Sequence, residues 1–124
     1  MVKANLGSHG VYLKTDSTSG TVAFYENVDR TTILIGIYLH LNAAPTINEN
    51  YTICRDAVSG SVYDTVLFSS DLSVDVIGED LVIMFAEPFY LVDGDVIRID
   101  YPNTSNITVS TTLVIQEAKL HKSI

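Results

Sequence analysis

Hydrophobic and polar residues alternate with a period of two along most of the chain, which is the spacing of a β-strand. Eight segments combine this alternation with β-branched or aromatic residues and are bounded by Gly, Asn, Asp or Pro. They are Gly10 to Lys14, Thr21 to Glu26, Thr31 to Leu41, Tyr51 to Val58, Ser61 to Ser69, Leu81 to Phe85, Val96 to Tyr101 and Ile107 to Gln116. No stretch of about ten residues has the apolar spacing of an amphipathic helix, so the chain is predicted to be all-β.

The third segment predicts a long central strand. Alternation places one set of apolar side chains on one face, namely Ile33, Ile35, Ile37, Leu39 and Leu41. Leu34, Gly36, Tyr38 and His40 then share the other face, which is only partly polar. We therefore expect a second layer or a neighbouring subunit to cover that face, with Tyr38 and His40 as candidate interface residues. The last segment alternates more cleanly, with Ile107, Val109, Thr111, Leu113 and Ile115 opposite Thr108, Ser110, Thr112, Val114 and Gln116.

Short turns join the predicted strands. Ser59-Gly60-Ser61 predicts a hairpin between the fourth and fifth segments, because Gly accepts a positive φ. Asp93-Gly94-Asp95 predicts a similar turn, and Pro102 ends the seventh segment. Such a chain without crossover helices predicts an antiparallel β-sandwich, with an eight-stranded jelly roll preferred. An immunoglobulin-like sandwich is less favoured, because the chain has no Trp and one Cys.

The chain is predicted to form one domain over residues 1–124, because it has no stretch typical of a linker. Two arms fall outside the eight strands, residues 1–9 and 118–124, and the second is either a short helix or an extended arm. In an oligomer, Lys119 and Lys122 are positioned to reach an acidic neighbouring surface, with Leu120 and Ile124 as apolar anchors. Residues 49–100 would form that surface, since they carry eleven acidic and two basic side chains.

The net charge of −8 disfavours binding to nucleic acid, which is itself a polyanion. No run of about 18 apolar residues is present, so no membrane-spanning segment is expected. The N-terminal residues also lack the apolar stretch of a secretory signal, which predicts synthesis in the cytoplasm.

Motifs for catalysis and for cofactors are not found in the sequence. There is no G-x-S-x-G elbow, no phosphate-binding glycine loop, and no clustering of His with the lone Cys54 at zinc-ligand spacing. If this fold carried an enzyme, Asp93 and Asp95 would be the only local candidates for a catalytic pair of carboxylates. We expect them instead to shape their turn. The sequence therefore predicts neither an enzyme nor a cofactor.

Calcium is the metal ion for which the sequence offers the most candidate ligands. Asp71, Asp75, Glu79 and Asp80 lie within ten residues of one another, and calcium binds carboxylate oxygens. The spacing of an EF-hand loop is nevertheless absent, and acidic connections between strands are usually solvated turns. We therefore predict no metal site.

Most of the seven Tyr and four Phe residues fall inside predicted strands, where core packing is their expected role. Phe89 and Tyr90 differ, because they follow Glu87-Pro88 in a predicted connection between strands. They are candidates for an exposed apolar contact or for a plug at the open end of the sandwich. An exposed aromatic pair of this kind also keeps open a carbohydrate-binding or receptor-binding module, in which aromatic rings stack on sugars.

Three features follow one another between Tyr38 and Leu113: an AAPT turn after a long apolar strand, the hairpin SGSVYDTVLFSSDLS, and the strand and turn GDVIRIDYPN. With them the chain resembles small β-proteins that decorate the capsids of tailed bacteriophages. The resemblance implies a jelly-roll cement protein, usually a homotrimer, that binds the major capsid protein over the junctions between its subunits. It also implies a place on the exterior of the virion and no chemistry. A receptor-binding domain of a phage tail or an adhesin is the alternative.

Overall fold

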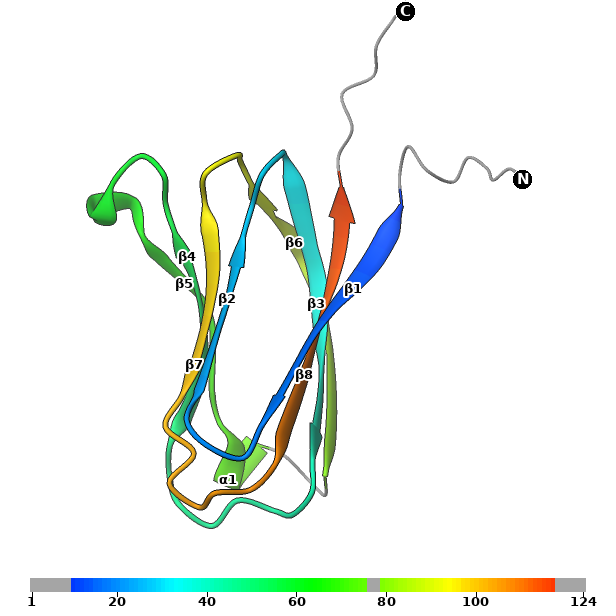
Figure 1. Cartoon of the computed structure of the whole chain (residues 1–124), viewed down its shortest axis with the longest axis vertical. Coiled ribbons are helices and arrows are strands. Elements are labelled where there is room, and N and C mark those ends of the chain that lie inside the picture. Colours follow the sequence, from blue (N-terminus) through cyan, green and yellow to red (C-terminus); the bar gives the residue numbers. More distant parts are fainter. Residues whose placement is uncertain (1–9, 76–78, 118–124) are drawn as a thin grey trace, which may run out of the picture.

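The computed structural model describes residues 10–75 and 79–117, which form two four-stranded antiparallel sheets packed face to face (Figure 1). The strands are β1 (Val11–Thr18), β2 (Val22–Asn27), β3 (Thr32–Leu41), β4 (Asn50–Asp56), β5 (Thr65–Asp71), β6 (Asp80–Leu91), β7 (Val96–Tyr101) and β8 (Val109–Glu117). A 3-10 turn, η2 (Ser61–Tyr63), precedes β5, and one helical turn, α1 (Leu72–Asp75), follows it. The predicted all-β sandwich is confirmed.

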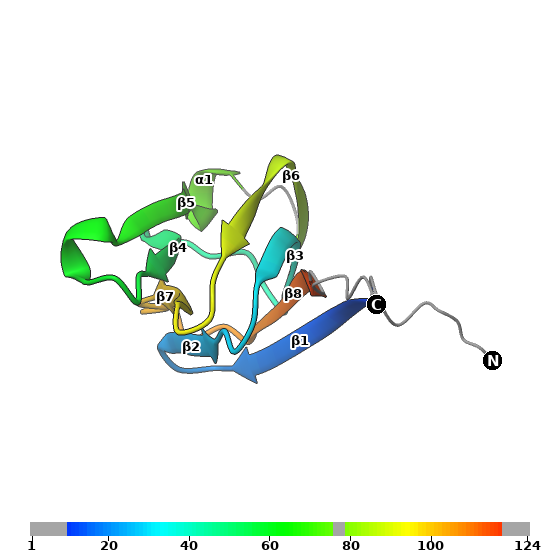
Figure 2. The same cartoon turned by 90° about the horizontal axis from the view of Figure 1, so that it is seen from above.

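The strand order is that of a jelly roll. One sheet has the order β1-β8-β3-β6 and the other has the order β2-β7-β4-β5. The first four strands pair antiparallel with the last four in reverse sequence, β1 with β8, β2 with β7, β3 with β6 and β4 with β5. The chain is thus one long hairpin rolled up, in which only the connection from β4 to β5 stays within a single sheet. Seen from above, β1 and β2 lie at one side of the sandwich and β5 and β6 at the other (Figure 2).

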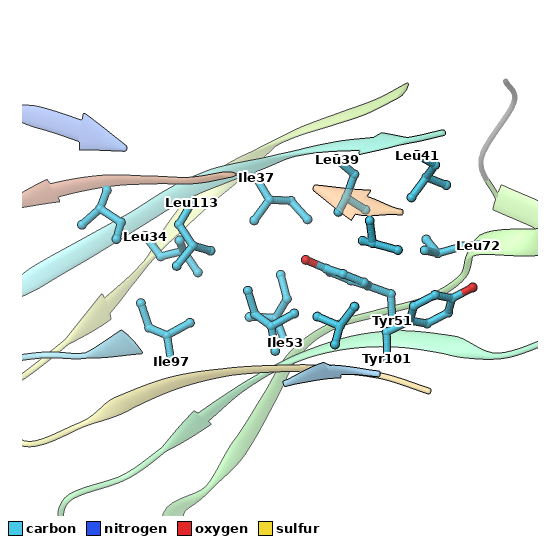
Figure 3. Close-up of a cluster of buried hydrophobic side chains, with 14 of the residues drawn as sticks. Leu34, Ile37, Leu39, Leu41, Tyr51, Ile53, Leu72, Ile97, Tyr101 and Leu113 are labelled. Atoms are coloured by element: carbon cyan, nitrogen blue, oxygen red, sulfur yellow. The ribbon is translucent and has the colours of Figure 1, made fainter. Parts of the chain in front are cut away.

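The core lies between the two sheets and consists almost entirely of aliphatic side chains (Figure 3). Strands β3 and β8 contribute from one sheet, and β4 and β7 contribute from the other. Tyr51 places a hydroxyl group inside this core, where it shares a hydrogen bond of 3.0 Å with Thr111 Oγ1. The prediction for β8 is confirmed, because Val109, Thr111, Leu113 and Ile115 are all buried. The inner faces of the strands therefore account for the alternation in the sequence.

A β-bulge in β3 corrects the predicted faces of the central strand. Leu34 pairs with Ile115 and Gly36 pairs with Val114, so Ile35 is the extra residue. On the N-terminal side of the bulge, the inward and outward positions of the side chains are therefore exchanged relative to the prediction. Leu34 consequently points into the core with Ile37, Leu39 and Leu41, and Ile33 points outward with Tyr38 and His40. The prediction that Leu34 lies on the outer face was wrong.

Three predicted element boundaries differ from the structure by four residues or more, and the others differ by at most two residues. Strand β1 extends four residues beyond Lys14, through the polar run Thr15 to Thr18. The hairpin after Ser59-Gly60-Ser61 is confirmed, but η2 occupies its start and β5 begins at Thr65. Strand β6 continues past Phe85 to Leu91, so Phe89 and Tyr90 belong to a strand. Among the described residues, no helix has the length and apolarity needed to cross a membrane.

Strand β6 leaves no room for a side chain at Gly36 of β3. A Cβ atom at this position would lie 2.3 Å from the carbonyl oxygen of Ile83 and 2.8 Å from the sulfur of Met84. A backbone oxygen cannot move aside without shifting its strand. The absence of a side chain at Gly36 therefore permits this pairing of β3 with β6.

We expect Gly36→Ala to lower the free energy of unfolding by about 1–3 kcal/mol, because the added methyl group overpacks the contact with Ile83. Urea denaturation followed by circular dichroism measures the change. Gly20→Ala is the matched control, because its nearest neighbouring atom would be 3.8 Å from the new Cβ. An equal effect of the two substitutions would contradict the steric account.

Candidate functional site

The outward surface of the β1-β8-β3-β6 sheet is the candidate functional site, and we call it the apolar face. Side chains of directly paired residues lie on the same side of a sheet. One row across the four strands is Leu13, Val114, Gly36 and Met84, and the next is Thr15, Thr112, Tyr38 and Val82. A third row adds Val11, Gln116, Ile33 and Tyr90. Apolar side chains thus lie on all four strands, with Thr15, Thr112 and Gln116 among them.

The apolar face is exposed over much of its area. Tyr90 is 71% exposed, Val82 is 63% exposed, and Val11, Leu13 and Met84 are each slightly more than half exposed. Isolated apolar side chains are normal on a protein surface, whereas a contiguous patch marks an interaction site. The arrangement of these residues in adjacent rows makes the face such a patch.

The outward surface of the β2-β7-β4-β5 sheet is more polar, although the exposed side chains of Tyr25 and Val66 also lie on it. Arg98 lies at its centre and pairs with Asp56 at 3.1 Å and with Asp100 at 2.9 Å. Tyr25 donates a hydrogen bond of 3.3 Å from its hydroxyl group to Asp100. Cys54 pairs with Arg98 across the strands, and burial raises the pKa of its thiol, which disfavours the reactive thiolate. The two broad surfaces of the sandwich are therefore chemically distinct.

His40 and Asp80 form an ionisable pair at one end of the apolar face. His40 Nδ1 lies 2.5 Å from Asp80 Oδ1, in the row that continues Ser17 and Ser110 across the sheet. The hydrogen bond to Asp80 raises the pKa of His40. The charge at this end of the face therefore depends on pH in the range where histidine titrates.

The structure brings together part of the predicted set of interface residues. Tyr38, His40 and Tyr90 all lie on the apolar face. Phe89 points inward, where its ring packs edge to face against Phe85 with centroids 4.9 Å apart, so it is partly buried against the core. Lys119, Leu120, Lys122 and Ile124 lie outside the described residues.

Sequence reasoning did not place Val11, Leu13, Ile33, Val82 and Met84 on the apolar face. Each alternates with residues that point inward, as Val82 and Met84 do with Leu81, Ile83 and Phe85. A run that is apolar on both sides predicts a strand but does not say which side meets the core. The signal was the uninterrupted apolar stretch Leu81 to Phe85, which is typical of a strand covered on two faces.

Asp95 is fully buried and organises the turn that the sequence predicted around Gly94. Its carboxylate accepts hydrogen bonds from the backbone N–H groups of Val58 and Val92 and from Arg55 Nε, all at 2.9–3.0 Å. Burial on its own would raise the pKa of Asp95, but these three donors outweigh burial and hold that pKa below its usual range. The carboxylate therefore links the β4–β5 connection to the β6–β7 turn and has a structural role.

Asp71, Glu79 and Asp80 do not gather into a metal site in the described part of the chain, and the side chain of Asp75 lies outside it. No three His, Cys, Asp or Glu side chains there lie close enough together to hold an ion. Asp71 instead accepts hydrogen bonds from Ser73, which lower its pKa, and from Asn48. Asp80 faces His40. Each of these two carboxylates thus has a local partner.

Comparison with models of known protein families and with curated protein sequences finds no match for the chain. The candidate site consequently rests on the geometry described above.

We expect a ¹H NMR titration to give His40 a pKa above the usual value of about 6.5, because Asp80 stabilises the protonated ring. The stabilising effect of the pair is complete below about pH 6.5 and is lost as the pH rises through the raised pKa. Asp80→Asn should return the pKa toward 6.5, and His40→Gln assigns the resonance. An unchanged His40 pKa in Asp80→Asn would contradict the pairing.

We expect Asp95→Asn to lower the free energy of unfolding at neutral pH by about 2–4 kcal/mol, because it removes the partner of Arg55 and an acceptor for a backbone N–H. The pKa of Asp95 is depressed in the folded state. Its contribution is therefore present above the unfolded pKa of about 3.9 and is lost as the pH falls through the folded value.

Urea denaturation at neutral and at acid pH measures both effects, and the loss of stability in acid should be smaller in the variant. Asp93→Asn is the matched control on the exposed side of Gly94. An effect of Asp93→Asn equal to that of Asp95→Asn would contradict the role of the buried carboxylate.

Proposed function

We propose that this protein is a structural virion protein that decorates a phage capsid and stabilises it without catalysing a reaction. The apolar face carries the proposal, because it is a contiguous, exposed surface on an otherwise complete sandwich. In this proposal the apolar face binds the major capsid protein, and copies of the chain associate as a trimer on the exterior of the virion.

The energetics of the apolar face support docking on a protein surface. Covering the exposed half of the Met84 side chain contributes roughly 1 kcal/mol, about half of the value for burying such a side chain fully. A stable interface buries on the order of 800 Å² per partner, and a four-stranded sheet offers a surface of that scale. Many copies on one shell multiply these contributions, so a moderate affinity per copy is sufficient to stabilise the assembly.

The strand order and the sequence resemblance support the same assignment. A jelly roll with β1-β8-β3-β6 and β2-β7-β4-β5 sheets is the fold that the resemblance to phage decoration proteins implies. The polar surface around Arg98 suits the side that meets water. The two surfaces thus match a protein that presents one side to a capsid and the other to solvent.

We expect Met84→Lys to weaken binding to shells of the major capsid protein from the same genome by more than about tenfold, because a desolvated charge is unfavourable in an apolar contact. Co-sedimentation of the purified chain with such shells measures the binding. Tyr25→Lys is the matched control, since Tyr25 is similarly exposed on the polar surface.

Sedimentation of the free chain separately reports its association, for which a trimer is expected. A wild-type chain that stays monomeric and does not bind the shells would contradict the proposal. Equal weakening by Met84→Lys and Tyr25→Lys would contradict the assignment of the docking face.

A further inference from the structure

His40 and Asp80 lie on the apolar face, directly beside exposed apolar side chains. The two residues are paired across β3 and β6, and the neighbouring pair on the same side of the sheet is Tyr38 with Val82. Tyr38 is 40% exposed and Val82 is 63% exposed. The two pairs are about 7 Å apart along the strands, at the end of the sandwich where β3 ends and β6 begins (Figure 1). A partner that covers Tyr38 and Val82 therefore also covers the ionisable pair.

The ionisable pair is held by a short hydrogen bond but is open to water. His40 Nδ1 lies 2.5 Å from Asp80 Oδ1, and the two side chains are 62% and 72% exposed. In the same row, β8 and β1 contribute the uncharged residues Ser110 and Ser17. Glu79, next to Asp80 in the chain, is a second carboxylate whose field acts on His40. Water solvates both protonation states of the pair in the free protein, and docking would remove that water.

The net charge of the pair changes when His40 titrates. With the ring protonated, the imidazolium and the carboxylate of Asp80 compensate each other, and the pair is neutral as a whole. Once the ring loses its proton, it can still donate a hydrogen bond to Asp80, but the negative charge of the carboxylate is no longer compensated. An uncompensated charge is unfavourable in an interface from which water is removed, whereas a compensated pair costs less to cover.

We propose that this pair makes docking of the apolar face pH-dependent, with binding strongest while His40 is protonated and weaker once the proton is lost. The pH dependence rests on the proposed function, because it concerns the same face and the same capsid partner. By linkage, docking stabilises the protonated ring further and takes up a proton where free His40 is neutral. Because Asp80 raises the pKa of His40 above its usual value of about 6.5, the affinity should change above that pH.

Co-sedimentation of the full chain with shells of the major capsid protein from the same genome tests the proposal, when it is repeated from about pH 5.5 to about pH 8.5. We expect the affinity of the wild-type chain to fall about three- to tenfold toward the upper end of this range. Such a fall corresponds to a rise of about 0.5–1 in the pKa of His40 on docking. Groups on the shell also titrate, so the wild-type profile is compared with the profiles of variants.

His40→Gln should lose the part of the pH dependence that His40 contributes, because glutamine forms hydrogen bonds but does not titrate. Asp80→Asn should reverse the direction of that part. In this variant the protonated ring has lost its compensating partner, so the affinity should fall as the pH decreases through about 6.5. A purely structural role of Asp80 would not produce such a reversal. Asp93→Asn, in the exposed β6–β7 turn, is the matched control for the change in net charge and should keep the wild-type profile.

Two outcomes would overturn the proposal while leaving the docking face intact. One is a wild-type chain and His40→Gln that bind with the same pH profile. The other is Asp80→Asn that keeps the wild-type direction of the pH dependence. No binding of any of these chains at any pH would instead overturn the proposed function, and the pH dependence with it.

Discussion

Strand β8 lies between β1 and β3, and the remaining architecture depends on this position. Its inner face supplies Val109, Thr111, Leu113 and Ile115 to the core, and its two edges hold the first and third strands in one sheet. Strand β7 holds the corresponding position between β2 and β4. Because both strands come from the second half of the chain, neither sheet is complete until the two halves are paired. The sandwich is thus stabilised by contacts between residues far apart in the sequence.

This pairing leaves two broad outer surfaces whose chemistry differs. One carries Arg98 between two carboxylates and is adapted to water. The other carries Val82, Met84 and Tyr90 in adjacent rows, with the ionisable pair of His40 and Asp80 at one end. The difference arises from the second, outward set of alternating positions in β3 and β6, which is apolar although the core does not need it. This surplus of apolar residues is the physical basis of the proposed docking function.

Alternation and turn chemistry were sufficient to predict the eight strands, the β4–β5 hairpin and the Gly94 turn. They could not locate the bulge at Ile35, because Ile33, Leu34 and Ile35 are all apolar and any phase of the alternation fits them. The extension of β6 was missed for a different reason. From the pair Gly36–Met84 to the pair Leu34–Phe89, six residues of β6 lie opposite three residues of β3, so Glu87 and Pro88 interrupt the pattern inside a single strand. Of the candidate site residues, Tyr38, His40 and Tyr90 lie together on one face, whereas Phe89 packs against the core, and the sequence could not show this because the register between strands decides it.

The rolled hairpin also determines when the protein acquires its structure during synthesis. Of the eight strands, β1 is made before all the others, yet β8, which pairs with it in the sheet, is made after all the others. Until β8 is made, the backbone of β1 has no partner strand, and one edge of β3 is also unpaired. Contacts of such long sequence separation form slowly, and exposed strands are prone to pair with other chains in the meantime. Among the four pairs of strands, only β4 and β5 are made in immediate succession. Their hairpin is therefore the natural starting point for folding, after which β3 can pair with β6, β2 with β7 and finally β1 with β8.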